Sequence, residues 1–335
     1  MKICIVRTDK MGDMILTLPI IQGLKEVNKN YQIDIVCSGA NQKICHKYKI
    51  INNIFLLQKK FLKNFKIILN LRKQNYNYIF TFSPGIASLL ISVFSKSRIK
   101  SLLILKSRYK NDYKGKLIER ILGKIFFNQC LVIDRQLRYS QNKPIHQTKI
   151  MMELVAKNGL QLNDHADIKN IFELNKIKFN SEKLCLIHLS SKWINKYFSE
   201  DNFISLLENL KHLNINILMT TDNSSRDVFY KIFKKYDIVT NNDSKNLNKI
   251  NQVLILDQLN FDNWTSIIYS SAYIITPECG CTHIASLSDA KLCVIYDADN
   301  LPDMIANEYA PWKKKYTKIF SNDQNLEKKL ISFIN

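Results

Sequence analysis

Short runs of β-branched and aliphatic residues alternate along the chain with longer stretches in which apolar residues recur at helical spacing. In the first half this pattern predicts strands near 2–7, 32–37, 53–57, 77–82, 99–105 and 130–134. It predicts helices between them, near 13–27, 41–48, 60–75, 85–95, 113–128 and 143–158. Alternation of this kind is typical of βαβ units, and therefore of a parallel sheet covered by helices.

The alternation restarts after a polar stretch at about 160–182. Strands are predicted near 184–190, 214–221, 252–256, 272–276 and 292–297, with helices near 200–213, 225–236, 261–271 and 282–289. A chain of 335 residues is long for one core and suits two domains. We therefore expect two doubly wound, Rossmann-like α/β domains facing a central cleft, with ligands bound beyond the carboxyl ends of the strands.

The excess of positive charge is confined to the first half. The whole chain carries a net charge of +20, and residues 1–150 hold 28 Lys and Arg against 7 Asp and Glu. The other 185 residues are almost balanced, with 21 basic and 22 acidic residues. A bias in genome composition would act on both halves, so an anionic partner is expected at the first one. Nucleic acid, anionic lipid headgroups and a phosphorylated substrate all fit, and a solvated basic face without a partner is the alternative.

Several classes of protein receive no support. The longest apolar stretch, "GIASLLISVF" at 85–94, is about half of what a bilayer requires, and the N-terminal apolar run is too short for a signal peptide. The eight cysteines show no Cys-x-x-Cys and are expected to be reduced thiols of a cytosolic protein. The histidines have no spacing typical of metal ligands, so we expect no metal and no cofactor.

Three polar loops at the predicted strand ends carry candidate chemistry. The first, "RTDKMGD", places Asp13 where the first strand passes into the first helix. The purely structural interpretation is that Asp13 caps the N-terminus of the helix, because a carboxylate there accepts backbone N–H groups and complements the helix dipole. If the side chain instead projects into the cleft, it can take a proton from a substrate hydroxyl. Gly12 alone is not a Gly-x-Gly-x-x-Gly fingerprint, so dinucleotide binding has little support.

The second and third loops suit an anion. In "HLSSKWINKYFSEDNF", Ser190 and Ser191 offer donors, while Lys192 and Lys196 offer point charges. In "TPECGCTHIASL", the backbone N–H groups of Cys281, Thr282 and His283 follow a permissive Gly280 at the start of a helix, and Glu278 stands at the strand end. Ordinary capping, solvated lysines and a core histidine are the competing interpretations, and Cys279-Gly-Cys281 is only a weak candidate for half of a metal site.

The three loops, in this order, resemble those of the ADP-heptose:lipopolysaccharide heptosyltransferases, the ninth glycosyltransferase family. The resemblance covers almost the whole chain and is carried by "KICIVRTDKMGDMILTLPIIQGLKEV", "IHLSSKWINKYFSEDNF" and "AYIITPECGCTHIASLSDAKLCVIYD". It implies a GT-B fold with an N-terminal acceptor domain (1–165) and a C-terminal nucleotide-sugar domain (183–315). It also implies a last segment (316–335) whose helix packs back on the first domain.

The resemblance further implies inverting, metal-independent transfer in which Asp13 is the general base. The lysine that holds the donor diphosphate corresponds to Lys196, assisted by Ser190, Ser191, Lys192, Gly280, Cys281 and Thr282. Glu278 and His283 are assigned to the donor sugar, and Arg7, Lys59, Lys60 and Lys63 to the acceptor. The family's usual Asp-Thr-Gly reads Glu278-Cys279-Gly280 here, which lengthens the carboxylate side chain by one methylene and removes a hydroxyl.

The partners implied are a nucleotide-sugar donor, in the first instance ADP-heptose, and an anionic, phosphorylated, lipid-linked sugar acceptor. The implied location is the cytoplasm, in peripheral contact with the anionic inner face of the bacterial inner membrane, and no nucleic acid partner is expected. Two alternatives stay open. One is a diverged, non-catalytic GT-B protein that binds anionic lipid or nucleic acid through its basic half; the other, less supported, is a nucleotide-dependent oxidoreductase.

Overall fold

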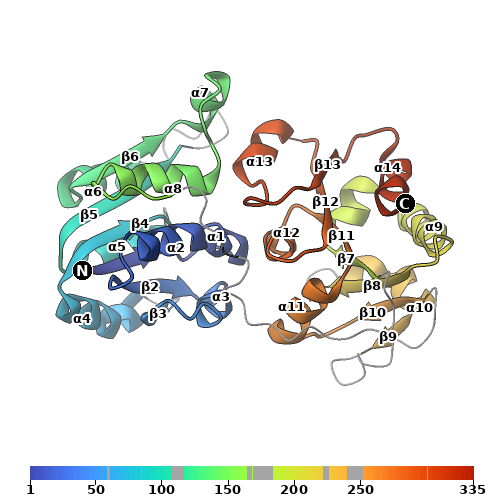
Figure 1. Cartoon of the computed structure of the whole chain (residues 1–335), viewed down its shortest axis with the longest axis horizontal. Helices are drawn as coiled ribbons and strands as arrows, with labels where there is room; N and C mark the ends of the chain where they lie inside the picture. Colours follow the sequence, from blue (N-terminus) through green and yellow to red (C-terminus); the bar gives the residue numbers. More distant parts are fainter. Residues whose placement is uncertain are drawn as a thin grey trace. The chain divides into compact units, whose positions relative to one another are not determined.

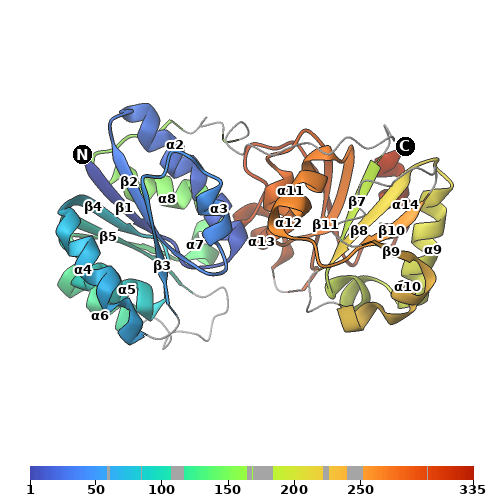
Figure 2. The same cartoon turned by 90° about the horizontal axis from the view of Figure 1, so that it is seen from below.

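The computed structural model describes residues 1–58, 61–83, 85–106, 117–163, 168, 184–221, 226–239, 252–299 and 301–335. The chain divides into two compact units, each with its own parallel sheet (Figures 1 and 2). The first unit comprises Met1–Phe172 together with Asn307–Ala310, and the second comprises Glu173–Ala306 with Pro311–Asn335. Within the described ranges, none of the helices combines the length and apolar character that crossing a bilayer requires.

The first unit contains six parallel strands in the order β3-β2-β1-β4-β5-β6. The strands are β1 (Lys2–Val6), β2 (Gln32–Ser38), β3 (Asn53–Leu57), β4 (Tyr76–Thr81), β5 (Ser97–Leu105) and β6 (Gln129–Ile133). The helices are α1 (Met11–Ile15), α2 (Leu18–Val27), α3 (Gln42–His46), the 3₁₀ turn η1 (Phe61–Asn64), α4 (Phe65–Gln74), α5 (Ile86–Phe94), α6 (Leu117–Phe126), α7 (Arg135–Ser140) and α8 (Gln147–Ala156). Helices α4, α5 and α6 lie side by side on one face of the sheet, while α2 and α8 cover the other (Figure 2).

The second unit contains seven parallel strands in the order β13-β12-β11-β7-β8-β10-β9. They are β7 (Leu184–Leu189), β8 (Asn216–Thr221), β9 (Asp237–Val239), β10 (Val253–Leu256), β11 (Tyr273–Pro277), β12 (Lys291–Tyr296) and β13 (Thr317–Phe320). The helices are the π-helical turn η4 (Trp193–Tyr197), α9 (Glu200–Lys211), the 3₁₀ turn η5 (Arg226–Phe229), α10 (Tyr230–Lys235), α11 (Phe261–Ser270), α12 (Gly280–Ala285), α13 (Pro302–Glu308) and α14 (Leu326–Ile334). Helices α9, α10 and α14 cover one face, and α11 and α12 cover the other (Figures 1 and 2).

Within the described residues, the predicted strands and helices are confirmed with two informative differences. Residues 60, 113–116 and 225, which fall within predicted helices, lie outside the described residues. The single helix expected near 13–27 is two helices, because Pro19 lies in the first turn of α2, where its missing N–H is tolerated. The helix expected near 282–289 ends at Ala285, after which the hydroxyls of Ser286 and Ser288 donate to carbonyls three residues back. The pattern missed α7, η4, β9, α13 and β13, which are short.

The last helix, α14, belongs to the second unit. Leu326, Leu330 and Ile334 of α14 are buried in the core of this unit, together with Leu206 and Leu210 of α9. Its apolar stripe thus completes a core formed by α9 and the second sheet. That this helix also packs back on the first domain stays a prediction.

A different segment of the C-terminal half joins the first unit. Glu308, at the end of α13, is fully buried and accepts hydrogen bonds from Arg135 Nη1 at 2.9 Å and from Gln147 Nε2 at 2.6 Å. The carbonyl of Ala310 lies 3.0 Å from Nε2 of His146. The first unit therefore includes four residues that are remote from it in sequence.

Candidate functional site

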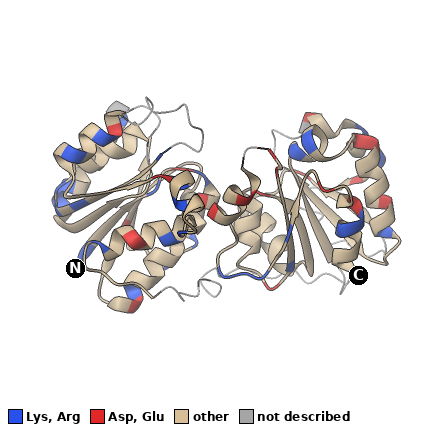
Figure 3. Cartoon of the chain, turned by 90° about the horizontal axis from the view of Figure 1, so that it is seen from above, with Lys and Arg blue, Asp and Glu red and all other residues tan. Residues whose placement is uncertain are grey.

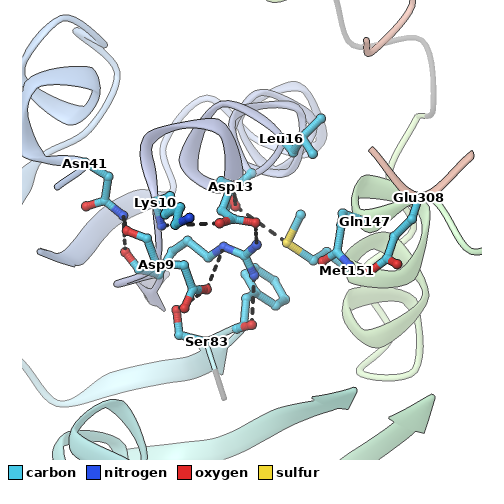
Figure 4. Close-up of polar contacts among 12 residues, drawn as sticks. Asp9, Lys10, Asp13, Leu16, Asn41, Ser83, Gln147, Met151 and Glu308 are labelled. Carbon is cyan, nitrogen blue, oxygen red and sulfur yellow. Dashed lines mark hydrogen bonds and ion pairs between the residues drawn. The ribbon is translucent and has the colours of Figure 1, made fainter. Parts of the chain in front are cut away.

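The first loop lies at the switch point of the first sheet. Strand β1 stands between β2 and β4, and the chain leaves β1 toward β2 but leaves β4 toward β5. The loops that follow β1 and β4 therefore diverge, and such a point is where α/β sheets bind ligands. The β1 loop supplies Arg7, Asp9 and Asp13, and the β4 loop supplies Phe82 and Ser83 (Figure 4).

Arg7 organises this cluster. Its Nη2 donates to Asp13 Oδ1 at 2.8 Å, its Nη1 donates to the carbonyl of Phe82 at 2.8 Å, and its Nε lies 3.4 Å from Asp9 Oδ2. Only 2% of the Arg7 side chain is exposed. The assignment of Arg7 to the acceptor stays a prediction. In this structure the buried guanidinium has three internal partners and fixes the two carboxylates.

Asp13 is held at both oxygens. It is the third residue of α1, and its Oδ2 accepts the backbone N–H of Lys10 at 3.2 Å while Oδ1 faces Arg7. Asp13 therefore accepts a backbone N–H at the start of α1, as the capping interpretation predicts. The interpretation as a proton acceptor stays open as well, because 18% of the side chain is exposed. A carboxylate whose orientation is set from both sides and which still reaches solvent can accept a proton from a bound hydroxyl.

The surrounding backbone is fixed by polar side chains that the sequence pattern did not single out. The Asn41 amide donates to the carbonyls of Arg7 at 3.0 Å and Asp9 at 3.1 Å. The Ser83 hydroxyl donates to Asp9 Oδ2 at 2.8 Å, and the Thr17 hydroxyl donates to the carbonyl of Asp13 at 2.8 Å. The partners come from β1, from β4 and from the loop after β2, so only strand order brings them together.

Of the three lysines assigned to the acceptor, the structure describes only Lys63. Lys59 and Lys60 lie outside the described residues. Lys63 is exposed in η1, after β3, and β2 separates β3 from β1 in the sheet. Their role in acceptor binding stays a prediction.

The second and third loops meet at the switch point of the second sheet, between β7 and β11. Lys192 Nζ donates to the carbonyl of Glu278 at 3.0 Å and lies 3.7 Å from its Oε2. Lys196 Nζ lies 3.0 Å from Asp297 Oδ2 and 3.2 Å from Asp299 Oδ2, and Asp297 Oδ2 is also 3.5 Å from Lys192 Nζ. The structure thus confirms that these two loops converge, and it adds carboxylates from the loop after β12.

The charges in this cluster are coupled. Burial raises the pKa of Asp297, but the hydrogen bond from Tyr197 and the charges of Lys192 and Lys196 outweigh it, so this pKa lies below its usual value. Hydrogen bonds to Asp297 and Asp299 raise the pKa of Lys196. Lys196 is therefore cationic at neutral pH. Lys192 and Lys196 each already face a carboxylate that an incoming anion would have to displace.

The sequence pattern missed Asp297 and Asp299. The signal was present in "YDADN", where two carboxylates follow directly after a predicted buried strand. Tyr197, whose hydroxyl donates to Asp297 Oδ1 at 2.7 Å, carried no comparable signal because it lies in an unpredicted π-helical turn.

The remaining donor-site residues serve the local structure as well. The Thr282 hydroxyl is fully buried, accepts the N–H of Cys279 at 3.2 Å and donates to the carbonyl of Pro277 at 3.1 Å. Thr282 is the third residue of α12 and Cys279 is the N-cap, so Thr282 supports the helix start without being its N-cap. Ser190 and Ser191 are half-buried in the loop after β7, and their carbonyls accept the first N–H groups of the following turn. Cys281 is buried, and Gly280 begins α12.

The His283 side chain is only 2% exposed in the second unit, as the core interpretation predicts. Its assignment to the donor sugar stays a prediction. No cluster of His, Cys, Asp and Glu suited to a metal ion occurs among the residues that the structure describes.

Comparisons with known proteins place these features in context. Residues 65–331 match the family described as glycosyltransferase family 9 (heptosyltransferase). Lipopolysaccharide heptosyltransferase 1 of Campylobacter coli is 25% identical over 174 residues, which are 51% of this chain and 44% of that protein. The chain therefore matches less than half the length of this curated relative.

Solved structures resemble the whole chain. E. coli heptosyltransferase WaaC with ADP has a TM-score of 0.73 and 14% identity, and the match covers 100% of both chains. The family 9 glycosyltransferase of Veillonella parvula has a TM-score of 0.73 and 12% identity over 99% of this chain and 90% of that one. E. coli ADP-heptose lps heptosyltransferase II has a TM-score of 0.70 and 13% identity over 100% of this chain and 98% of that one. At these identities the likeness concerns the fold, and it confirms the predicted GT-B class.

Proposed function

The chain belongs to glycosyltransferase family 9, the heptosyltransferases, and from that premise we propose that it transfers heptose from ADP-heptose to a lipopolysaccharide inner-core acceptor. The donor is suggested by relatives described with ADP and with ADP-2-deoxy-2-fluoro heptose, and the acceptor by the name of the Campylobacter coli relative. The observation that carries the proposal is the Asp13 carboxylate, oriented by Arg7 and Lys10 at the switch point of the first sheet.

In the proposed reaction Asp13 takes the proton of the acceptor hydroxyl as its oxygen attacks the anomeric carbon. The bond between that carbon and the diphosphate oxygen breaks on the opposite side, so the configuration inverts and ADP leaves. Negative charge develops on the departing diphosphate, and Lys192 and Lys196 are placed to stabilise it without a metal. The backbone N–H groups at the start of α12 would add to this stabilisation.

The acceptor is expected to be phosphorylated and lipid-linked, which accounts for the basic first half of the chain. The proposal includes peripheral contact with the anionic inner face of the bacterial inner membrane, where such an acceptor would be met. It assigns Lys59, Lys60 and Lys63 to the acceptor and Glu278 to the hydroxyls of the donor sugar.

The role of Asp13 is tested by Asp13→Asn, which removes the base and keeps the size of the side chain. We expect kcat for heptose transfer to fall by about 100-fold or more, because a positioned general base contributes on that scale. The Kd for ADP, measured by calorimetry, should not change, since Asp13 belongs to the other unit.

Asp9→Asn is the matched control, because Asp9 also faces Arg7 but with 32% of its side chain exposed and with Ser83 as a second partner. A larger loss of kcat in Asp9→Asn than in Asp13→Asn would transfer the role of base to Asp9. Titration with ADP, GDP and UDP in the presence of a chelator tests the donor. Preference for ADP supports the proposal, and failure to bind any of them contradicts it.

A further inference from the structure

Helix α6 is amphipathic in the unusual sense that its apolar side is turned to solvent. Leu117, Ile118, Ile121, Ile125 and Phe126 are all exposed, with 65% of Ile125 accessible. The residues turned toward the sheet are Glu119 and Gly123, both buried. A surface helix normally shows the reverse arrangement, so the exposed stripe calls for an explanation.

The orientation of α6 is set by packing at Gly123. A Cβ atom at this position would lie 2.9 Å from Cys130 Sγ and 3.2 Å from Leu102 Cδ2, which means that the helix backbone approaches β5 and β6 closely. Glycine permits this approach without displacing the Cys130 and Leu102 side chains, which a larger residue would have to push aside. Because the glycine side must face the sheet, the apolar side is held toward solvent by the fold.

The apolar stripe continues over the two neighbouring helices. Ile86 and Phe94 of α5 are exposed, and so are Phe65 and Leu69 of α4. Of the 17 exposed large hydrophobic residues among the described ranges, nine lie on these three helices. Singly scattered apolar residues are ordinary on a protein surface, whereas a concentration of this kind marks an interaction site. We call the exposed surface of α4, α5 and α6 the apolar-basic face.

On the described residues of α4, α5 and α6, cations accompany the apolar residues and exposed anions do not. Lys66, Arg72 and Lys73 of α4 are exposed, as are Arg120 and Lys124 of α6. Figure 3 colours the Lys and Arg positions of the chain blue and the Asp and Glu positions red. The sequence has no acidic residue between Ile51 and Lys100, and Glu119, the one acidic residue of α6, is buried. Apolar side chains among cations, with no opposing charge, complement a lipid surface that is apolar below and anionic above.

We propose that the apolar-basic face docks the protein on an anionic lipid bilayer, with the side chains of α6 inserted among the headgroups. The inference deepens the proposed function, since it rests on a lipid-linked acceptor to explain why the enzyme needs a membrane. It assigns the contact to one face and attributes its orientation to Gly123. A second copy of the chain would also cover apolar residues, but the uncompensated cations of two identical faces would repel one another.

The test is co-sedimentation of the full chain with vesicles of phosphatidylcholine alone, or of equal parts phosphatidylcholine and phosphatidylglycerol. Wild type should bind the anionic vesicles, and its binding should weaken with salt. Ile121→Glu/Ile125→Glu should lower the partition coefficient about tenfold or more, because it places two carboxylates against the lipid. Lys66→Glu/Lys73→Glu should lower it by a similar factor.

Matched controls come from exposed positions elsewhere in the first unit. Leu137→Glu changes an exposed leucine of α7, and Lys29→Glu reverses an exposed charge in the turn after α2. Both should leave vesicle binding unchanged. Circular dichroism and ADP titration verify that all variants are folded.

Three outcomes would overturn the proposal: equal binding of wild type to neutral and anionic vesicles, full binding by the α6 variant, or a lipid-free dimer that the α6 substitutions dissociate. The vesicles contain neither donor nor acceptor, so failure to dock is distinguishable from failure of the transferase proposal. The latter is read from ADP titration and from transfer to a detergent-dispersed acceptor.

Discussion

At the scale of single residues, the two candidate sites use the same device. In each, a cation lies between two carboxylates: Arg7 between Asp9 and Asp13, and Lys196 between Asp297 and Asp299. The two differ in burial. Arg7 is 2% exposed and serves as a fixed support, whereas Lys196 is 39% exposed and can exchange one anionic partner for another.

That difference leads to a prediction for Asp297. Asp297→Asn removes the charge that competes with a diphosphate for Lys192 and Lys196, so ADP should bind about two- to fivefold tighter. Lys196→Ala should weaken binding about tenfold, since it removes a charge-assisted hydrogen bond. Calorimetry gives both Kd values. Asp201→Asn, which breaks the exposed pair with Lys231, is the control.

The pH dependence of the Asp297 effect follows from its pKa. Because this pKa lies below the usual value, Asp297 stays ionised at and above about pH 5. The ratio of the Kd values for ADP of wild type and Asp297→Asn should be constant in this pH range. It should shrink at lower pH, where the Asp297 carboxyl becomes protonated. Weaker ADP binding by Asp297→Asn would instead mean that Asp297 holds the lysines in their binding positions.

At the scale of elements, helix ends and helix faces position the chemistry. Asp13 owes its place to the start of α1, and Thr282 stabilises the turn that opens α12. Rotation of α6 about its axis decides which residues the first unit presents to its surroundings. This rotation depends on one glycine.

Gly123→Ala should therefore destabilise the protein. The added methyl group would meet Cys130 and the fully buried Leu102, and crowding of this kind costs about 1–3 kcal/mol, less the gain in helix propensity. Gly39→Ala is the matched control because a Cβ atom there meets nothing within 4 Å, and it should be neutral or slightly stabilising. Urea unfolding measures both; equal free energies of unfolding would mean that α6 does not depend on this close approach.

At the scale of the whole molecule, the two units are not simply the two halves of the chain. Asn307–Ala310 belongs to the first unit, although residues on either side belong to the second. The buried ion pair of Glu308 with Arg135 and the hydrogen bond from Gln147 hold the segment Asn307–Ala310 in the first unit.

Glu308→Ala should lower the stability of the first unit by about 3–5 kcal/mol, because it leaves the Arg135 charge buried without its partner. All three tryptophans, Trp193, Trp264 and Trp312, belong to the second unit. The unfolding transition followed by tryptophan fluorescence should therefore stay in place while the far-ultraviolet transition moves to lower denaturant concentration.

Glu153→Ala is the control for this prediction. It breaks an Arg–Glu pair of the same unit in which 36% of the Glu153 side chain is exposed, and it should cost about 1 kcal/mol or less. A fluorescence transition that shifts together with the far-ultraviolet one in Glu308→Ala would show that the two units unfold as one.

The amino-acid sequence by itself determined most of the strands and helices, the two α/β domains and the three loops at the strand ends, while the GT-B class was implied by the resemblance of those loops to a known family. These features are local: a period of 2 or 3.6 residues, a turn residue, a carboxylate after a strand. For the same reason Asp13, Lys192, Lys196 and Glu278 could be found from their positions alone.

Only the tertiary structure decided which residues meet. It buried Arg7 and His283, brought Asp297 to Lys196, placed α14 in the second unit and returned Glu308 to the first. It also turned the apolar side of α6 outward. Each of these outcomes depends on the order of strands in a sheet or on the rotation of a helix about its axis. Both arise from packing between segments far apart in the chain, so the pattern of apolar residues within a single segment does not reveal them.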